Sequence, residues 1–488
     1  MSLGRHFHDL EHYRAGEAGG YRLLPLRFTA LDEGRYVVTN MAGEYRVLTR
    51  AMLDQLVNHR LPQGKGLYDD LKASHFLYDA DSAVALPLTG LKYRTKLEQI
   101  AQFTGLHIFV VTLRCDYSCP YCQVSRQTDD QVAYDMSKAT ADKALELVFQ
   151  SPNPNIKIEF QGGETLLNFE LIRHIVRRAH EINREACRDL QFVIATNLSF
   201  MSEEVIDFCV SEGINISTSL DGPAELHNKN RPRPGKNGYQ LTADAIHRLQ
   251  AKLGRHRVSA LMTTTLESLE RVESIIDEYV ALGFREIFLR PLSPYGFAVR
   301  TGQINRYNTE RWLDFFKRGV EYIISLNRAG YPMREIYSSV VLRKMLTAQE
   351  PGYVDLRSPA GIAIGGVVYN YDGDVYASDE ARMSAEMGDT TFRLGNVHHD
   401  GYDEIFGNDT LLDAIEQSLG ASVPLCSDCA FLPYCGSDPV YHHTTQHDVV
   451  GNKALSGFCQ KNMGVFRYLI SKMEGDHYVR GLFSSWAF

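Results

Sequence analysis

The sequence of 488 residues is too long for one compact core, so two or three domains are expected. Hydrophobic residues make up 44% and charged residues 23%, which is typical of soluble globular proteins and excludes disordered and membrane classes. The formal charge of −9 argues against a chain dominated by nucleic-acid binding. The first 16 residues carry no signal peptide, so the nine cysteines are expected in the reducing cytoplasm, where metal or cluster ligation is favoured over disulfides.

A region of short strands and helices begins the chain. Arg35–Asn40 and Gly43–Thr49 predict a β-hairpin, followed by helices near Arg50–His59 and Gly66–Leu77. This arrangement resembles the winged-helix peptide-recognition domain of ribosomally made peptide pathways, which implies leader binding by strand addition at a sheet edge. Winged helices also bind DNA, but residues 21–77 hold eight Lys and Arg against six Asp and Glu, which disfavours a phosphate-binding face. A purely structural cap on the following domain is the third interpretation.

From about residue 107, short β-rich runs alternate with amphipathic helical stretches. This is the pattern of βα units in a parallel sheet, and six such units predict an α/β fold with an open, partial (β/α)6 barrel. The six strands are expected at His107–Leu113, Ile156–Phe160, Phe192–Ala195, Ile216–Ser219, Val258–Met262 and Glu286–Arg290.

Three cysteines follow the first of these strands. Cys115, Cys119 and Cys122 lie within one eight-residue loop, with three and two residues between them. A [4Fe-4S] cube needs one ligand for each iron, so three thiolates would hold the cluster and leave one iron free for another ligand. Taken alone, the loop also fits an incomplete tetrahedral zinc site with a distant fourth ligand. The remaining motifs must decide between the two.

Polar and glycine-rich motifs follow the other five strands, at the carboxyl ends where barrel enzymes place their chemistry. Glycines let the backbone approach a ligand closely, and Glu164 can accept a hydrogen bond from an ammonium group. Each motif alone is weak, because a tight turn explains it equally well, but their order and register after the cysteine loop favour the cluster. The motifs are Gln161-Gly162-Gly163-Glu164, Thr196-Asn197, Ser219-Leu220-Asp221-Gly222, Thr263–Thr265 and Arg290-Pro291-Leu292-Ser293-Pro294.

Together, the cysteine loop and these motifs resemble the signature of radical SAM enzymes. In that family S-adenosylmethionine (SAM) chelates the open iron, and reduction by the cluster releases a 5′-deoxyadenosyl radical. Arg231 suits a carboxylate ligand, because the planar guanidinium can donate two parallel hydrogen bonds to a carboxylate. The other interpretation is that Arg231 is a solvated loop residue. The resemblance assigns Tyr121 and Leu292 to the adenine, Gly163 and Glu164 to the methionyl amine, Ser219 to the ribose, Arg231 to the carboxylate and Asn197 to the same pocket.

A second cysteine group lies near the C-terminus. Cys426, Cys429, Cys435 and Cys459 can close a metal centre fully, either as an iron–sulfur cluster or as a zinc ribbon. The segment resembles the SPASM extension of peptide-modifying radical SAM enzymes, which usually carries two auxiliary clusters. The ligands of the nearer auxiliary cluster are missing here, at residues 358–361, at 375–379 and at 439. We therefore expect two [4Fe-4S] clusters in total, with the auxiliary one fully ligated and suited to electron transfer or structural support.

Asp379 is the candidate catalytic base. Related enzymes that oxidise a peptide side chain use an aspartate just after the missing cysteine position, and Asp379 matches it. The other interpretation is an ordinary acid after a β-hairpin, whose Asp372-Gly373 turn predicts type I′. Domain limits are expected at residues 1–100 for the N-terminal winged-helix-like domain, 101–345 for the radical SAM partial barrel and 346–488 for the SPASM-like domain.

Over nearly its whole length the chain resembles the radical SAM maturase B family of His-Xaa-Ser repeat peptide systems. Residues 107–115, 160–164, 289–296 and 369–376 carry this resemblance. It implies a ribosomally made precursor peptide as substrate, a C–C or C–O side-chain crosslink as product, and an electron donor such as flavodoxin or ferredoxin. The alternative is two-electron oxidation of Ser or Cys, as in sulfatase-maturing relatives. An alternative from another class is a non-catalytic protein, either an iron–sulfur electron carrier or a metal-stabilised peptide-binding protein. The predicted SAM pocket argues against this alternative.

Overall fold

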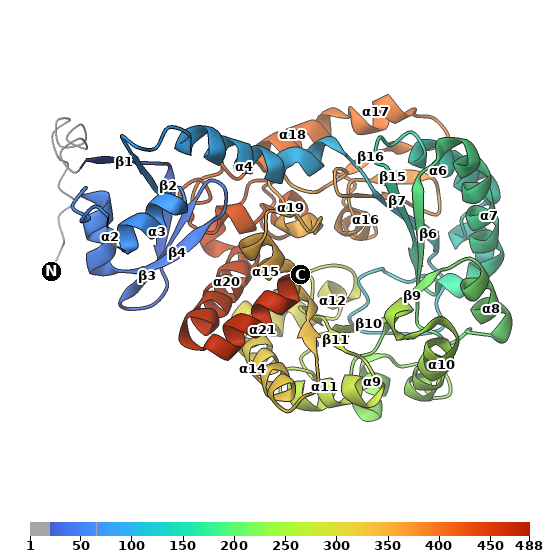
Figure 1. Cartoon of the computed structure of the whole chain (residues 1–488). Helices are drawn as coiled ribbons and strands as arrows, with labels where there is room; N and C mark the ends of the chain where they lie inside the picture. Colours follow the sequence, from blue (N-terminus) through green and yellow to red (C-terminus); the bar gives the residue numbers. More distant parts are fainter. Residues whose placement is uncertain (1–19, 65) are drawn as a thin grey trace.

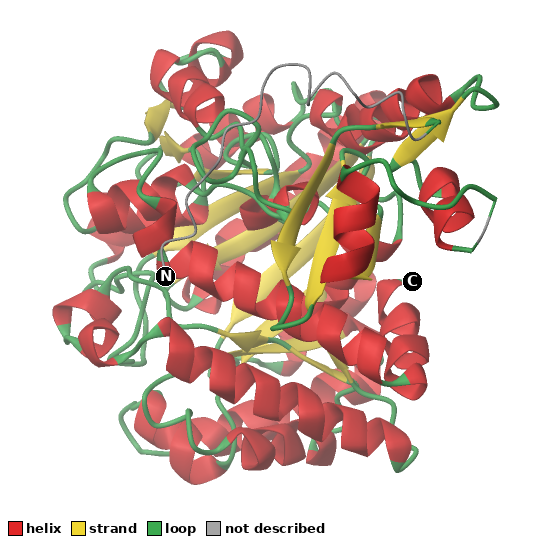
Figure 2. Ribbon diagram, turned by 90° about the vertical axis from the view of Figure 1, so that its left-hand side faces the viewer, coloured by secondary structure: helices red, strands yellow, loops and turns green. Residues whose placement is uncertain are grey.

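The computed structural model describes residues 20–64 and 66–488, so the first part of the predicted N-terminal domain, residues 1–19, lies outside the described residues. Within the described ranges, no helix combines the length and the apolar character needed to cross a membrane. Figure 1 shows the N-terminal elements at one end, the central βα units at the other and much of the C-terminal part between them. Helices surround the central strands (Figure 2).

The N-terminal region forms a small antiparallel sheet with helices packed beside it. The sheet order is β2-β3-β4, and a separate pair joins β1 to β5. The expected hairpin and both expected helices are present, and β2 adds a third strand that the sequence analysis did not predict. Tyr21, Val38, Leu56 and Phe76 belong to a hydrophobic core of this region alone. Its elements are β1 (Tyr21–Leu23), β2 (Leu26–Ala30), β3 (Arg35–Asn40), β4 (Tyr45–Thr49), α2 (Arg50–Val57), α3 (Leu67–Ala73), β5 (Leu77–Asp79) and α4 (Ala85–Ala101).

This N-terminal region packs against the segment that carries the second cysteine group. The Thr39 hydroxyl donates a hydrogen bond to the carbonyl of Ala430 at 2.6 Å. The Tyr434 hydroxyl donates to the carbonyl of Gly43 at 2.7 Å. Both bonds are buried, so the small sheet supports the loop of residues 426–435 from one side.

The six expected parallel strands are present and adjacent in one sheet. Their order is β12-β10-β9-β8-β7-β6, and all five pairings are parallel. Parallel strands need crossover connections, which the intervening helices supply. The elements are β6 (Leu106–Thr112), α5 (Gln131–Tyr134), α6 (Lys138–Val148), β7 (Asn155–Gly162), α7 (Phe169–Ala186), β8 (Asp189–Thr196), α8 (Glu203–Ser211), β9 (Asn215–Ser219), α9 (Ala224–Asn230), α10 (Gly238–Leu253), β10 (Val258–Thr263), α11 (Val272–Ala281), β11 (Glu286–Ile287) and β12 (Leu289–Arg290).

The predicted sixth strand, Glu286–Arg290, is interrupted at Phe288. Its first half, β11, pairs with β13 (Arg334–Glu335), whereas its second half, β12, pairs with β10. The buried carboxylate of Glu335 accepts a hydrogen bond from the Leu289 N–H at 3.2 Å, and the Trp312 indole donates to the Leu289 carbonyl at 3.2 Å. Side chains from later elements therefore form hydrogen bonds with backbone groups of this strand that a neighbouring strand would otherwise bind. Strand propensity does not encode such contacts.

The C-terminal region adds three strands to the same sheet, which has nine strands in total. β14 pairs parallel with β6, and β15 and β16 continue antiparallel. The expected hairpin joins β14 to β15, but its turn is not type I′, which requires positive φ at both central residues. Gly373 has a φ of +90°, whereas Asp372 is not among the residues with positive φ. The elements from residue 297 onward are α12 (Phe297–Arg300), α13 (Gln303–Arg306), α14 (Thr309–Arg328), β13, α15 (Ile336–Leu346), β14 (Gly366–Tyr369), β15 (Asp374–Tyr376), α16 (Asp379–Ala385), β16 (Arg393–Asn396), α17 (Tyr402–Phe406), α18 (Asp409–Gln417), α19 (Pro439–Gln446), α20 (Gly457–Gly475) and α21 (His477–Ala487).

Candidate active site

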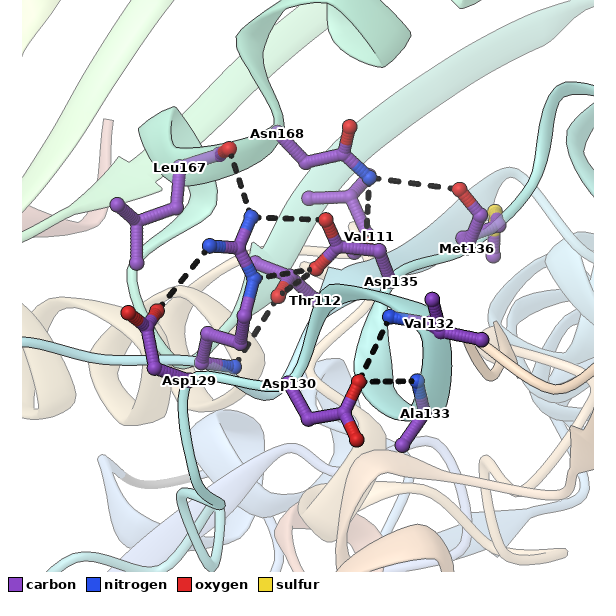
Figure 3. Close-up of polar contacts among 11 residues, drawn as sticks. Val111, Thr112, Asp129, Asp130, Val132, Ala133, Asp135, Met136, Leu167 and Asn168 are labelled. Atoms are coloured by element: carbon purple, nitrogen blue, oxygen red, sulfur yellow. Dashed lines mark hydrogen bonds and ion pairs between the residues drawn. The ribbon is translucent and has the colours of Figure 1, made fainter.

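Arg114, directly before the first cysteine, fixes the start of the cysteine loop. Its guanidinium makes two hydrogen bonds of 2.8 Å to the carboxylate of Asp135 and a third of 3.0 Å to the Leu167 carbonyl. Thr112, at the end of β6, donates to the same carboxylate at 2.5 Å (Figure 3). The side chains of Arg114 and Asp135 are only 5% and 16% exposed. This shielded fork holds the loop against the carboxyl end of β6.

The three loop cysteines lie together in a small apolar cluster. Cys115, Cys119 and Cys122 share it with Tyr121 and Leu292, as the predicted SAM pocket requires. Burial is the main cause that raises the pKa of Cys115 and that of Cys119, the latter to about 12, and neighbouring thiols raise both further. Iron binding would displace these protons and hold the groups as thiolates. The donor set therefore fits a cluster with one open iron.

Glu164 lies two residues after the end of β7 and has a fully buried carboxylate. It accepts hydrogen bonds from the Thr196 hydroxyl at 2.6 Å, the Leu166 N–H at 3.0 Å and the Asn197 N–H at 2.7 Å. Burial raises the pKa of Glu164 to about 7, and these three bonds oppose that rise. A carboxylate has about four acceptor sites, so one remains for an ammonium group. Asn197 extends the network to the cysteine loop, because its side-chain amide donates to Asp116 at 2.9 Å.

Arg231 directs its guanidinium into a buried network beside the same loop. It donates to the Tyr121 hydroxyl at 2.7 Å, which in turn donates to Asp221 at 2.6 Å. Burial alone would lower the pKa of Arg231, but Tyr121, Cys119 and Asp221 hold it well above its ordinary value. The buried Nε of Arg231 has no hydrogen-bond partner. The network argues against a solvated loop residue, and a ligand carboxylate would satisfy the orphaned Nε.

The remaining predicted contacts lie at the same edge of the sheet. The Gly163 N–H donates to the Thr112 carbonyl at 2.8 Å, and a Cβ at Gly163 would overlap the carbonyl oxygen of Arg114, so only glycine fits there. Ser219 is the last residue of β9, and Leu292 follows the end of β12. These residues end or follow strands at the carboxyl edge of the sheet, where the cysteine loop also begins, and their individual roles stay predictions.

The four C-terminal cysteines also influence one another. Burial, followed by the other thiols of the group, raises the pKa of Cys426 to about 11 and that of Cys435 to about 12. Four thiols in one place suit a fully ligated cluster. Among residues 20–64 and 66–488, no group of three or more His, Cys, Asp or Glu is arranged to hold a single metal ion.

Lys453 provides an independent test of that fit. Its side chain lies beside the four thiols in a residue that is only 5% exposed. Burial lowers the pKa of Lys453, and the charges of Cys426, Cys459, Cys435 and Asp438 raise it. In the described part of the chain its ammonium donates only to uncharged partners, including the Ser437 hydroxyl at 2.8 Å. A buried cation without an ion pair is costly, and a cluster on four thiolates would supply negative charge beside it.

Residues without a thiol stand at the positions where SPASM proteins usually have further cysteines. The Ser378 hydroxyl caps α16 by accepting the Ala381 N–H at 3.1 Å, and the Ser358 hydroxyl accepts the Gly420 N–H at 2.9 Å. Lys344 and Glu350, paired at 2.8 Å, line a cavity of about 90 Å³ together with Ser358. A second auxiliary cluster therefore has no thiolates at these positions.

A larger cavity, of about 650 Å³, lies against the inner side of the barrel. It is lined by Leu292 from the predicted SAM pocket and by Asp379, the candidate base. Asp379 is the first residue of α16, and its carboxylate lies 3.4 Å from the Nε of the buried Arg382. The carboxylate reaches the cavity but is paired with a cation, so its role as a base stays a prediction.

Three further acids on the same cavity wall escaped the sequence analysis: Asp355, Glu380 and Asp438. Burial is the main cause that raises the pKa of Glu380 and that of Asp438, and the charge of Asp355 raises both further. Glu380 follows Asp379 directly and could have been weighed with it. The other two are far apart in the sequence, and only the fold brings them together.

A family comparison decides the nature of the site. Residues 109–279, which include the cysteine loop and the strands β7 to β10, match the family model of the Radical SAM superfamily. This part of the chain is a radical SAM domain. A radical SAM domain binds SAM and a [4Fe-4S] cluster, and here the thiols of Cys115, Cys119 and Cys122 are the donors suited to that cluster.

Relatives of the radical SAM domain occur in bacteria and archaea. An uncharacterized protein of Methanocaldococcus jannaschii is 31% identical over 189 residues, 38% of this chain, and the match spans less than two thirds of that relative, 62% of its length. A cysteine-type anaerobic sulfatase-maturating enzyme of Clostridium novyi is 21% identical over 367 residues, 73% of this chain and 93% of that enzyme. The second match extends well beyond the radical SAM domain.

Solved structures show the same fold over most of the chain. The structure of anSMEcpe with bound AdoMet has a TM-score of 0.63 at 16% identity and covers 78% of this chain and 99% of its own. The structure of Streptococcus suis SuiB bound to precursor peptide SuiA has a TM-score of 0.53 at 12% identity and covers 89% of this chain and 98% of its own. The likeness concerns the fold, and it includes the region after the radical SAM domain.

Proposed function

We propose that the protein is a radical SAM enzyme that modifies a ribosomally made precursor peptide, similar to the maturases of His-Xaa-Ser systems. The observation that carries this proposal is the cavity of about 650 Å³ that joins Leu292 of the SAM pocket to the acids of α16, because it has the volume of a ligand site. SuiB, which has been solved with a precursor peptide, shares the fold and supports a peptide substrate.

The residues around the cysteine loop would prepare SAM for cleavage. When bound, the cluster and SAM supply a reductive cleavage that yields a 5′-deoxyadenosyl radical able to abstract a substrate hydrogen. The free Nε of Arg231 would orient the SAM carboxylate, and the remaining acceptor site of Glu164 would orient the amine. The apolar surface of Leu292 and Tyr121 would exclude water from the reacting atoms.

The proposed product is a peptide with a C–C or C–O crosslink between side chains, two hydrogens lighter than its precursor. Cys426, Cys429, Cys435 and Cys459 would hold the auxiliary cluster, and flavodoxin or ferredoxin would donate electrons. Asp379 would take a proton from the substrate once its pairing with Arg382 opens. The N-terminal region has a core of its own and an edge strand, β2, and both suit leader recognition; only residues 20 onward of that region are described.

A second candidate is two-electron oxidation of a Ser or Cys side chain. The match to the sulfatase-maturating enzyme of C. novyi, which covers 93% of that enzyme, favours it. Both reactions remove two hydrogens, so peptide mass alone does not separate a crosslink from oxidation of Ser. Oxidation of Cys gives a thioaldehyde, which becomes the same aldehyde when water replaces its sulfur as H2S, and that exchange does change the mass. A carbonyl product reacts with a hydrazide probe and leaves ordinary backbone fragmentation, whereas a crosslink blocks fragmentation between the joined residues.

The central experiment is anaerobic reconstitution with iron and sulfide, followed by SAM and dithionite. Formation of 5′-deoxyadenosine, with about eight irons per chain, is expected for two [4Fe-4S] clusters. The triple variant with Cys115, Cys119 and Cys122 changed to Ala should lose the product, whereas Cys209→Ala, at a buried cysteine outside both groups, should retain it. Zinc in place of iron and no cleavage of SAM would contradict the proposal.

Leader recognition has its own test at the edge strand β2. Phe28 on this strand is 48% exposed, so it is an apolar anchor available to an added strand. Phe28→Ala should weaken binding of a fluorescent leader peptide by about tenfold. The control Met52→Ala, at a 39% exposed residue of α2, should not. Equal affinities of wild type and Phe28→Ala, with SAM cleavage intact, would contradict recognition at this edge.

A further inference from the structure

One end of the large cavity carries acids that have no ion-pair partner within the described residues. Asp355, Glu380 and Asp438 come from three separate segments, and Asp438 also caps α19 by accepting the Tyr441 N–H at 2.9 Å. None of the described ion pairs includes any of these three carboxylates, in contrast to Asp379 beside them. Buried carboxylates without an ion pair are costly unless a proton, a hydrogen-bond donor or a nearby cation neutralises them.

Tyr295 provides a second and independent observation at the same place. It is only 1% exposed, it lines the cavity, and its buried hydroxyl has no hydrogen-bond partner. After burial, the charges that raise the pKa of Tyr295 most are those of Asp438, Glu380 and Asp355, so the phenol lies among the three carboxylates. A buried hydroxyl is normally satisfied, and this one is left for a ligand.

The acids of this group outnumber the cations that line the cavity by one. Arg290 and Lys461 line the same cavity, and Lys461 is held 5.3 Å from the centre of the Tyr337 ring and 5.1 Å from that of Phe458. Glu159, on the barrel wall, is paired with a lysine of its own strand at 3.3 Å, and Asp379 is paired with Arg382. Three carboxyl groups without an ion pair therefore share two cations, so at least one of the three must keep a proton or take up a further cation.

We propose that this end of the cavity binds one cationic side chain of the substrate peptide, that of a lysine or an arginine. The N–H groups of the side chain donate to the carboxylates of Asp355, Glu380 and Asp438 and to the hydroxyl oxygen of Tyr295. The assignment rests on the proposed function, because it names the class of peptide that the enzyme takes. It places a basic residue of the peptide in the same cavity that Leu292 of the predicted SAM pocket lines.

The test is competitive binding of short peptides to the reconstituted full-length enzyme with SAM present and without reductant. The probes are one mixture of peptides acetyl-Gly-Ala-Xaa-Ala-Gly-amide, in which Xaa is Lys, Arg, norleucine, Gln or Glu, and bound peptides are quantified by mass spectrometry after rapid filtration. Norleucine matches the lysine stem without its charge. The Lys or Arg peptide should be retained at least about tenfold more than the norleucine peptide.

Three variants and a matched control locate the effect. Glu380→Gln, Asp355→Asn and Tyr295→Phe, each of similar size to the wild-type residue, should reduce the preference for a basic peptide at least about threefold. Glu416→Gln, at an exposed acid of α18, should leave it unchanged. No preference for basic peptides, a preference for the Glu peptide, or an equal preference in all variants would overturn the inference. In the same preparations, 5′-deoxyadenosine formed after dithionite is added reports on the proposed function separately.

Discussion

Arg114 and Asp135 form a two-bond fork at the base of the cysteine loop, with both N···O distances at 2.8 Å. The pair is shielded from water, and breaking a buried pair costs about 3–5 kcal/mol. Without Asp135, the buried guanidinium keeps only Asp129 at 3.3 Å, whose side chain is 93% exposed. Asp135→Asn should therefore lower the free energy of unfolding of the apo chain by about 3 kcal/mol. It should also reduce the iron bound by Cys115 and its two partners, because the loop loses its anchor.

Denaturant unfolding and iron analysis measure these two effects. Glu146→Gln is the matched control, because Glu146 pairs with Lys143 at 2.9 Å on the surface, with side chains 59% and 51% exposed. Such a pair contributes less than about 1 kcal/mol. Similar losses in both variants would contradict a structural role for the fork.

Arg231 is expected to bind the SAM carboxylate through the face that carries its free Nε. Arg231→Lys keeps the charge but loses the planar fork, so the Kd for SAM should rise by about tenfold or more. Equilibrium dialysis of the reconstituted protein with labelled SAM measures this Kd. Arg248→Lys, at a surface arginine paired with Glu203 at 3.0 Å, is the control. An unchanged Kd in Arg231→Lys with normal iron content would remove Arg231 from the pocket.

Local patterns in the sequence were sufficient for the barrel and for most of the site. Five of the six predicted strands and the cysteine loop depend on neighbouring residues, and the structure has them where they were expected. The prediction of one continuous sixth strand was wrong, because the side chain of Glu335, about fifty residues later, accepts a hydrogen bond from the Leu289 N–H. The nine-stranded sheet was not predicted either, because the pairing of β14 with β6 joins segments about 260 residues apart.

The cavity acids show the same limit in the site. Asp379 was found because a motif precedes it, whereas Asp355 and Asp438 carry no motif and meet only in the folded chain. The role of Lys453 could not be predicted from the sequence either. It depends on the nearby cysteine thiols and on the lack of an anion among the described hydrogen-bond partners of Lys453. Long-range electrostatics of this kind cannot be read from residue spacing.

Lys453 gives a prediction whose sign differs between the two forms of the protein. In the apo chain Lys453→Met removes a buried cation that has no anionic partner in the described part of the chain, so the free energy of unfolding should rise by about 1 kcal/mol or more. In the reconstituted protein the same change removes a positive charge beside the auxiliary cluster, whose reduction potential should fall by about 60 mV, a tenfold change for one electron.

Redox titration followed by electron paramagnetic resonance measures that potential. Lys472→Met, at a lysine on the outer face of α20 that pairs with Glu321 at 2.8 Å, is the control and should shift neither quantity. A lower stability of the Lys453→Met apo chain would show that Lys453 has a partner other than the cluster.

Glu380 predicts a pH dependence of stability. Burial, followed by the charge of Asp355, raises the pKa of Glu380 from the ordinary 4.5 to about 8. Between these values the folded chain holds a proton that the unfolded chain has released, so this contribution to stability is complete below about pH 4.5 and is lost as the pH rises through about 8. Gln cannot ionise, so Glu380→Gln should unfold with nearly the wild-type free energy at about pH 5 and with at least about 1 kcal/mol more than wild type at about pH 8.

Denaturant unfolding of both chains at the two pH values measures the difference, with Glu416→Gln as a control that should show none. A difference between Glu380→Gln and wild type that does not change with pH would mean that Glu380 is ionised throughout, already balanced by Arg290 or Lys461 on the same cavity wall.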